Sequence, residues 1–592
     1  MRRCINCCGI VLCLLPGSFV HATQILDAIE ITGLDKTTDA ALRDNIMSSL
    51  SLSSLRGSDL SPSRLEYILI QTQNQAQKAL EPFGYYSSKI HISVARKATH
   101  FTVFINVDKQ QAVRVQHSHI ALEGWAQKDR YLAEDLKSFT PKLGNIFNQG
   151  QYETSKLKIS HRLQERGYFD ADLISHRVSI FRPTHAADID LVWDSGRRYA
   201  MGPTHFDYDY FTPGLFDPLV YWKEGDYYHE GRIDRLRESL QKLDYFRVID
   251  IQPHPDQADT QGRVPVSVHL ERAKRTVYTA GLSYGTETGP GVRLGVQRRY
   301  LNRRGHKVDT QFNFAKKRKI TQVLYRIPAF HWLDGWYSIL VRHQDEQTRY
   351  IDFNNLHLAV GRSGQINRYW NINLTYNLLR EQWRYGDNNT YLRADHYQTS
   401  TLLFPEADAN YINVDDPIFP RHGNAISIQV RSGLQYLGAD TNFSQGQILL
   451  RKYQGIGPYG RLLLRGELGT SWISNFAKIP PSLRYFAGGS NSIRGYAFRE
   501  VGPRTHEGFA LGAKSVLTGA VEYEYYFHGG PFGMATFFDM GSAFNKHPDW
   551  HKGYGIGFRY RSPVGPIRVD IAHGIDHPDS AFQLYFDLGT NL

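Results

Sequence analysis

Cysteine is almost absent from this chain of 592 residues. All four copies, Cys4, Cys7, Cys8 and Cys13, lie in one short segment at the amino-terminal end. If that segment is removed on export, the mature chain contains no disulfide. An exported protein without disulfides depends on its hydrogen bonds and its packing, and a closed β-barrel supplies both.

Long apolar runs are also missing. The run from Ile5 to Leu15 is too short to cross a bilayer as a helix, which takes about 20 apolar residues. No segment after residue 22 is a plausible transmembrane helix either. Arg2 and Arg3 precede this run, and the small-residue site Val20-His21-Ala22 follows it. This order is typical of a secretory signal peptide, so we expect residues 1–22 to be cleaved off.

Several signatures of cofactors and partners are lacking. The net charge of +11 is spread along the chain, and no basic run with interleaved aromatics indicates nucleic-acid binding. The 24 histidines show no metal-ligand spacing, and no glycine-rich phosphate loop follows a buried strand. We therefore expect no nucleic acid, no metal and no cofactor.

One motif has the spacing of a hydrolase. Gly281-Leu282-Ser283-Tyr284-Gly285 fits the GxSxG pattern. That pattern is catalytic on a turn between a strand and a helix, but here it lies in an alternating strand with no helix after it. We expect that the protein is not an enzyme.

Aromatic residues and glycine are abundant. The chain has 36 Tyr, 31 Phe and 51 Gly but only 5 Met, and its mean hydropathy is −0.43. Strands of a transmembrane barrel alternate between lipid-facing and lumen-facing side chains, so their average composition is polar. The composition therefore favours such a barrel.

The first part of the chain repeats one plan three times, which predicts α+β units at residues 23–109, 110–195 and 196–273. Each copy has a helix that leads into an aromatic turn, at Gly84-Tyr85-Tyr86, Gly167-Tyr168-Phe169 and Asp244-Tyr245-Phe246. Two strands follow each turn, and the second alternates between apolar and polar residues. One face of each small sheet should therefore pack on helices while the other meets water.

Residues 274–592 show alternating segments of about 10 residues separated by turns, with no helical periodicity. They predict an all-β transmembrane barrel of about sixteen antiparallel strands. Near the end of the chain, Tyr554, Ile556 and Phe558 should face lipid while Gly555 and Gly557 face the lumen. The same alternation puts Asp570 and Tyr585 on the lumen side. A soluble β-sandwich can alternate in the same way, but it would rarely line its second face with so many glycines and charges.

A long connection between the eleventh and twelfth expected strands carries the most specific motif. It contains Gly488, Gly489, Arg494, Gly495 and Tyr496, and a later strand reads Phe537-Phe538-Asp539-Met540-Gly541. Both segments resemble the lid-loop signature of the outer-membrane assembly factor superfamily.

This resemblance implies that residues 486–505 form a lid that folds back into the barrel, where Arg494 meets Asp539 beside Gly541. An arginine in a narrow lumen needs a carboxylate partner with bidentate geometry, which makes the pairing physically reasonable. The glycines would permit backbone angles that a Cβ forbids. The alternative is an ordinary surface loop with a solvated arginine.

The three repeats, each expected to run strand, helix, helix, strand, strand, resemble POTRA domains, the periplasmic modules of that superfamily. Three copies point to its TamA branch. The resemblance implies a Gram-negative-type outer-membrane location with the repeats in the periplasm. It also implies contact with outer-membrane lipid, a TamB-like periplasmic partner, and outer-membrane proteins as clients. With the repeats in the periplasm, the lid connection starts on the extracellular side, as the signature requires.

The superfamily's mechanism, as the resemblance implies it, is that the first and last strands pair weakly and let a client strand add to the exposed edge. We expect this seam at Val277, Gly281 and Gly285 on one side and at Phe586 and Gly589 on the other. The glycines would weaken the ladder. A two-partner secretion channel or a lipid-transport pore of the same superfamily remain the alternative functions.

Overall fold

The structure is a computed structural model that describes residues 24–588, except residues 98–99, 286–287, 332–334, 349, 388–391, 394–395, 507, 563–564, 577 and 579–580. The expected signal peptide at 1–22 and Gly589 of the expected seam lie outside the described residues. In the described part of the chain, no helix is both long and apolar enough to cross a membrane.

The first repeat is a four-stranded sheet with strand order β2-β1-β4-β3. Its elements are β1 (Gln24–Thr32), α1 (Ala40–Ser49), β2 (Asp59–Leu60), α2 (Pro62–Leu80), β3 (Lys89–Lys97) and β4 (His100–Asp108). The alternating residues Phe101, Val103, Ile105 and Val107 of β4 are all buried in one core with Ile46 of α1 and residues of α2. The period-two pattern thus directs one face of the sheet onto the helices.

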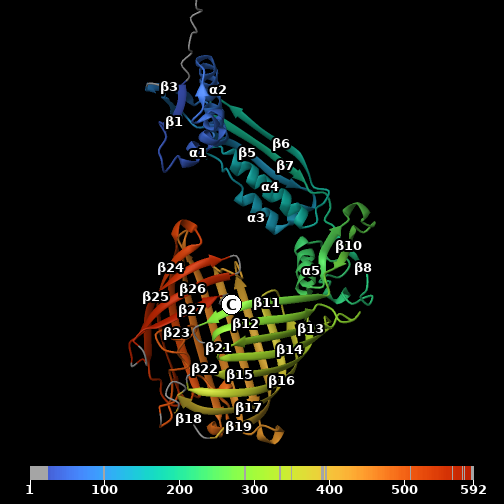
Figure 1. The fold of residues 1–592 in the computed structure, drawn as a ribbon. Coiled ribbons are helices and arrows are strands. Elements are labelled where there is room, and N and C mark those ends of the chain that lie inside the picture. The colour runs from blue at the N-terminus through green and yellow to red at the C-terminus, as the bar shows by residue number, and fades with distance from the viewer. Residues whose placement is uncertain are drawn as a thin grey trace, which may run out of the picture. The chain divides into compact units, whose positions relative to one another are not determined.

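The second repeat has strand order β5-β7-β6, and Figure 1 shows both of its helices beside this sheet. Its elements are β5 (Arg114–Glu123), α3 (Arg130–Ser138), α4 (Gln149–Glu165), β6 (Asp172–Phe181) and β7 (Ala186–Asp194). The side chain of Asn148 accepts a hydrogen bond from the Gln151 N–H and caps α4. Gly167 ends the helix with a φ of 83°, a value that glycine adopts without strain.

The third repeat departs from the expected plan. It contains β8 (Ala200–Tyr208), α5 (Glu230–Leu243), β9 (Phe246–Pro253) and β10 (Arg263–Arg272), in the order β8-β10-β9. Within its described residues, a single 3-10 turn (Asp217–Leu219) stands where the first helix was expected. Pro213, Gly214 and Pro218 explain the difference, because proline and glycine interrupt a helix.

The turn after α5 joins the third repeat to the barrel. Asp244 takes a left-handed φ of 57° where the first two copies have glycine, and its carboxylate accepts a hydrogen bond of 2.9 Å from Nε of Arg299. The Nζ of Lys307, a buried side chain, donates to the carbonyl of Leu243 at 2.6 Å. The hydroxyl of Tyr245 donates to the carbonyl of Gly305. The end of α5 is therefore fixed to the turn between β12 and β13.

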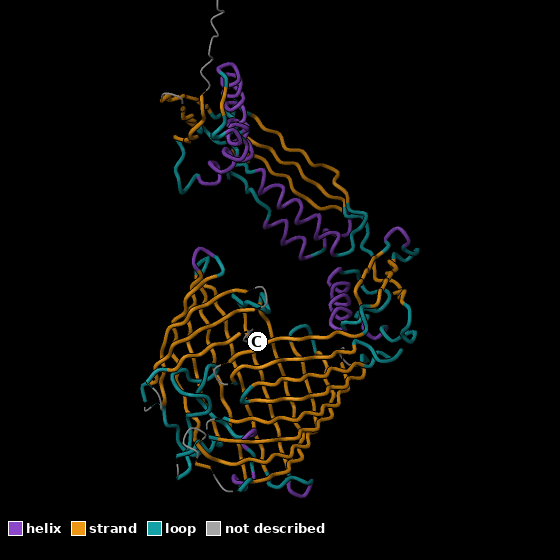
Figure 2. Tube along the Cα trace, in the orientation of Figure 1, coloured by secondary structure: helices purple, strands orange, loops and turns teal. Residues whose placement is uncertain are grey.

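The second half of the chain forms one antiparallel barrel wall, in which consecutive strands are neighbours (Figure 2). Over the described residues there are sixteen wall strands, as expected, and a two-residue strand β18 (Leu392–Arg393) in the connection after β17. The wall strands are β11 (Thr276–Gly285), β12 (Gly289–Arg298), β13 (Lys307–Ala315), β14 (Arg318–Ala329), β15 (Gly335–Gln347), β16 (Ile351–Gln365), β17 (Trp370–Asp387), β19 (Gln398–Val414), β20 (Gly423–Gly433), β21 (Phe443–Ile456), β22 (Gly460–Ile473), β23 (Ser515–Tyr526), β24 (Phe532–Phe544), β25 (His551–Ser562), β26 (Gly565–Gly574) and β27 (Gln583–Leu588).

The two faces of the wall differ as the alternation predicted. On β25, Tyr554, Ile556 and Phe558 are exposed on the outer face, whereas Arg559 is buried. On β24, Phe538 is exposed and its neighbour Asp539 is fully buried. A sandwich would bury the apolar face in a core. An exposed apolar face and a charged interior are instead the arrangement of a barrel in lipid.

Candidate lid and seam

The connection between β22 and β23 is folded into a compact, buried segment. Residues 493–496 at its centre are all buried. Gly488, Gly489 and Gly495 have φ values of 98°, 105° and 102°, in the left-handed region that glycine adopts most easily. A backbone hydrogen bond of 3.1 Å from the Gly489 N–H to the Tyr496 carbonyl closes this turn. We call residues 486–505 the lid.

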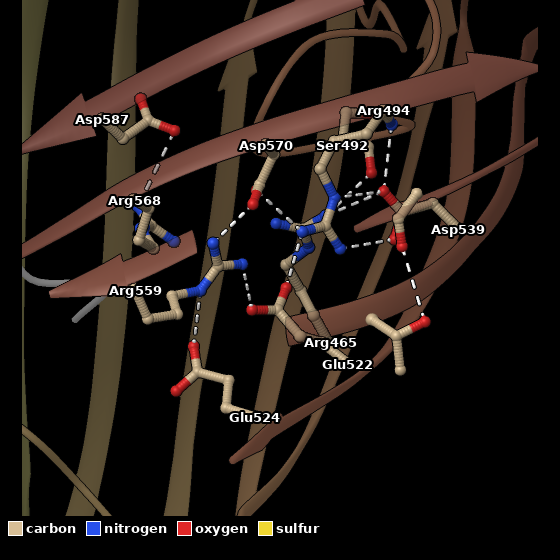
Figure 3. A network of polar contacts seen from close by, with 12 residues as sticks. Arg465, Ser492, Arg494, Glu522, Glu524, Asp539, Arg559, Arg568, Asp570 and Asp587 are labelled. Atoms are coloured by element: carbon tan, nitrogen blue, oxygen red, sulfur yellow. Dashed lines mark hydrogen bonds and ion pairs between the residues drawn. The ribbon is translucent and has the colours of Figure 1, made fainter. Parts of the chain in front are cut away.

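Arg494 binds Asp539 through both oxygens of the carboxylate (Figure 3). The Nε donates to Oδ2 at 2.7 Å and the second terminal nitrogen donates to Oδ1 at 2.8 Å. The backbone N–H of Arg494 also donates to Oδ2, at 2.9 Å. The two side chains are 3% and 0% exposed. Such a bidentate pair fixes the direction of the arginine as well as its position.

The pair belongs to a larger buried network of charges on β23, β25 and β26. Arg494 also binds Glu522 at 2.6 Å and Asp570 at 3.2 Å. Arg559 binds the same Glu522 at 2.6 Å and also contacts Asp570, and it reaches Glu524 at 3.0 Å. Guanidinium and carboxylate groups therefore alternate through the network, so that each buried charge has an opposite neighbour.

Glycines on β25 make room for the lid and its partners. A Cβ on Gly553 would lie 1.8 Å from the carbonyl oxygen of Arg494, and one on Gly557 would lie 1.9 Å from Oδ1 of Asp570. The sequence placed Gly555 and Gly557 on the lumen side without assigning this purpose. Their missing side chains let the lid approach the wall at van der Waals distance.

The remaining lid residues pack against the end of β26. A Cβ on Gly495 would lie 2.5 Å from the backbone nitrogen of Gly574. The ring of Tyr496 is buried, and its hydroxyl accepts the Asp576 N–H at 2.9 Å. Gly541 makes a different contact, because a Cβ at this position would meet Leu517 and Thr518 of the neighbouring strand β23. Its role as a lid partner therefore stays a prediction.

The first and last wall strands are neighbours without a ladder between them. Val277 and Gly281 of β11 pair with β12, and Phe586 of β27 pairs with Val569 of β26. The order of paired strands begins at β11 and ends at β27, and no ladder joins these two strands in the described residues. The rings of Tyr284 and Phe586 touch edge to face, with centroids 6.0 Å apart.

A cavity of about 490 Å³ opens beside this seam. It is lined by Gly281 and Gly285 of β11, by Asp587 of β27, and by Ser490 and Asn491 of the lid. The Ser490 hydroxyl lies 3.4 Å from Oδ1 of Asp587. The seam and the lid, which the sequence treated as separate features, therefore share one cavity.

Sequence reasoning assigned no role to several residues of the site. Glu522 and Asp570 contact Arg494, and Tyr585 contacts the lid backbone. The available signal was the alternation itself, which put Asp570 and Tyr585 on the lumen side. A charged or hydroxyl group that is buried on that face needs a hydrogen-bond partner.

The sixteen-stranded barrel with its inward lid and three α+β repeats defines a class of outer-membrane barrels with periplasmic modules. Three family models match the chain. The Omp85 superfamily domain matches residues 301–592, the POTRA domain TamA domain 1 matches residues 28–109, and the surface antigen variable number repeat, a POTRA model, matches residues 118–194. The chain belongs to the Omp85 superfamily, and its first repeat is of the TamA type.

Two relatives show how far the similarity extends. The outer membrane protein assembly factor BamA of Nitratidesulfovibrio vulgaris is 23% identical over 365 residues, which cover 60% of this chain and 46% of that protein. The chain thus spans about half the length of this curated relative. A crystal structure of Haemophilus ducreyi BamA lacking POTRA domains 1–3 has a TM-score of 0.59 at 17% identity, over 81% of this chain and 99% of that one. It shows the same fold.

Proposed function

We propose that this protein is an outer-membrane assembly and translocation factor that inserts or secretes β-barrel and autotransporter-type clients. Its substrate would be an unfolded strand, and its action would be transport without covalent catalysis. The observation that carries the proposal is the seam, where β11 and β27 adjoin without ladder hydrogen bonds in the described residues. An open strand edge at that place can accept a client strand by β-augmentation.

The lid supports assembly over passive diffusion. A simple pore needs an open lumen, whereas here a buried segment is bound to the wall through Arg494 and Asp539. The cavity at the seam also has polar groups from the lid on one side and the edge of β11 on the other. A client strand entering there would meet hydrogen-bonding groups instead of lipid alone, which lowers the cost of exposing its backbone.

The repeats supply a surface for partners in the periplasm. The TamA-type first repeat, residues 28–109, motivates a TamB-like partner. We expect this partner to be retained by the full chain in a pull-down from periplasmic extract and to be lost when residues 24–109 are deleted. Retention by the deleted protein would contradict the assignment of this repeat.

The seam is tested by locking it. In a protein with cysteines at Tyr284→Cys and Phe586→Cys, a short thiol cross-linker joins β11 to β27. Ile556→Cys with Ile571→Cys is the matched control, because these residues face outward and already pair across the β25–β26 ladder. We expect cross-linking of the first pair to abolish client insertion into liposomes and cross-linking of the second to leave it unchanged. Full activity with the first pair locked would refute the proposal.

A further inference from the structure

The lid backbone is bonded to the last wall strand as well as to Asp539. The hydroxyl of Tyr585 on β27 accepts the Gly495 N–H at 3.0 Å and donates to the Tyr496 carbonyl at 2.6 Å. One hydroxyl thus satisfies a donor and an acceptor of the two residues that follow Arg494. Tyr585 therefore holds this part of the lid from the last wall strand.

The side chain that carries this hydroxyl is buried. Tyr585 is 3% exposed and packs in a small apolar cluster with Phe537 and Ala572. Phe537 in turn lies under the guanidinium of Arg494, with 3.4 Å between the guanidinium carbon and the ring centre. If β27 moved away, the buried N–H of Gly495 and C=O of Tyr496 would lose this partner, which is unfavourable.

Over the described residues, β27 is also the wall strand with the fewest ladder pairs. Its ladder with β26 holds six residue pairs, from Ile567 with Leu588 to Ala572 with Gln583, and its other edge faces β11 without a ladder in the described residues. Tyr585 pairs with Asp570 in the middle of this short ladder. Asp570 itself binds Arg494. Displacement of β27 would therefore break the two lid bonds of Tyr585 and would also remove the ladder partner of Asp570, which binds Arg494 from β26.

We propose that Tyr585 is the positioning residue that couples the lid to the seam, so that addition of a strand at the free edge of β27 and release of the lid favour each other. The inference rests on the proposed function, because it takes strand addition at the seam as the event that is coupled. By linkage, a lid that is held in place weakens the addition of a strand to the edge of β27, and an occupied edge loosens the lid to the same extent.

Tyr585→Phe keeps the ring and removes only the hydroxyl. The full chain in lipid nanodiscs is mixed with a synthetic peptide of residues 581–592 of this chain, and hydrogen exchange of the lid is followed. In the unaltered protein we expect the peptide to speed exchange of the lid about fivefold or more, the equivalent of one hydrogen bond. In Tyr585→Phe we expect faster exchange without the peptide and no further response when the peptide binds.

Tyr554→Phe is the control, since Tyr554 is exposed on the outer face of β25 and should respond like the unaltered protein. Fluorescence anisotropy reports peptide binding independently. If the peptide binds both proteins and their lids respond equally, the coupling is overturned while strand addition stands. The cross-linked seam gives a second measurement that requires no change at Tyr585.

Failure of the proposed function is distinguishable from failure of the coupling. If the peptide binds neither protein, strand addition at the seam is overturned. The coupling is then judged by hydrogen exchange of the lid in the protein that is cross-linked between positions 284 and 586. Slower exchange than in the uncross-linked protein supports the coupling, and unchanged exchange overturns it.

Discussion

The ring of Phe537 on β24 occupies the space in which residue 555 of β25 would carry a side chain, because that residue is glycine. A Cβ built on Gly555 would lie 2.5 Å from the tip of this ring and 2.2 Å from the carbonyl oxygen of Ile571. The two residues are cross-strand partners. The glycine therefore determines where the ring lies, and the ring supports Arg494 from below.

Gly555→Ala should consequently displace Phe537 and loosen the lid. One added methyl group in a packed site costs about 1–3 kcal/mol through strain and shifted backbone. We expect a lower unfolding midpoint in urea and faster proteolysis within residues 486–505. Gly446→Ala is the matched control, since a Cβ at Gly446 has no atom within 4 Å. Equal proteolysis of the two variants would show that the ring does not support the lid.

The buried network predicts a larger effect at Arg494. Arg494→Met leaves Asp539 without its bidentate partner and removes one of the two arginines on Glu522. Breaking a buried pair in this way costs about 3–5 kcal/mol. Arg494→Lys should lose less, because an ammonium group keeps the charge but not the forked geometry. Both losses of stability are measured by urea unfolding in detergent. The folded fraction is read from the change in gel mobility that the barrel shows on heating.

Arg368→Met serves as the control for charge removal. Arg368 is exposed in the turn between β16 and β17, and its side chain stacks on Tyr369. Surface substitutions of this kind change stability by about 0.5 kcal/mol or less. A loss at Arg494→Met that is no larger than at Arg368→Met would mean that the network does not stabilise the barrel.

The joint at the end of α5 gives a third prediction. Lys307→Met keeps the length of the buried side chain but leaves the Leu243 carbonyl without the donor that it has now. An unsatisfied buried carbonyl costs about 1–3 kcal/mol. We expect faster hydrogen exchange in residues 230–243, with little change in β21 to β24. Lys242→Met, which removes an exposed hydrogen bond to Gln365, should leave exchange in α5 unaltered.

The sequence predicted the barrel and its two faces because period two is a local property. Whether Asp539 is buried and Phe538 exposed follows from their positions on one strand once the lumen side is known. The motif also indicated that Arg494 and Asp539 meet, although the pairing joins residues 45 positions apart. A resemblance supplied that contact, since alternation alone cannot relate a loop to a distant strand.

Other features needed three-dimensional placement. The helix expected near the start of the third repeat fails at Pro213 and Pro218, which a reading by analogy with the first two copies overlooked. Tyr585 was placed on the lumen side, but its two partners lie in a loop whose path depends on glycines 488, 489 and 495 together. Every residue has a backbone C=O, and every residue except proline has a backbone N–H. The sequence therefore does not indicate which of these groups in a loop will bind a distant side chain.

The outer face of the wall supplies the last prediction. Val341 lies near the middle of β15, and its cross-strand neighbours Val323 and Leu358 also face outward. An arginine at the midplane of a bilayer costs a barrel about 2–4 kcal/mol, and the cost falls to about 0–1 kcal/mol near the interfaces. Val341→Arg should therefore reduce folding into liposomes strongly. His343 lies on the same face, closer to the end of the strand and to Asp345. The loss of folding caused by His343→Arg should therefore be smaller. Both substitutions introduce the same side chain, so equal losses at the two positions would contradict a lipid boundary that crosses β15.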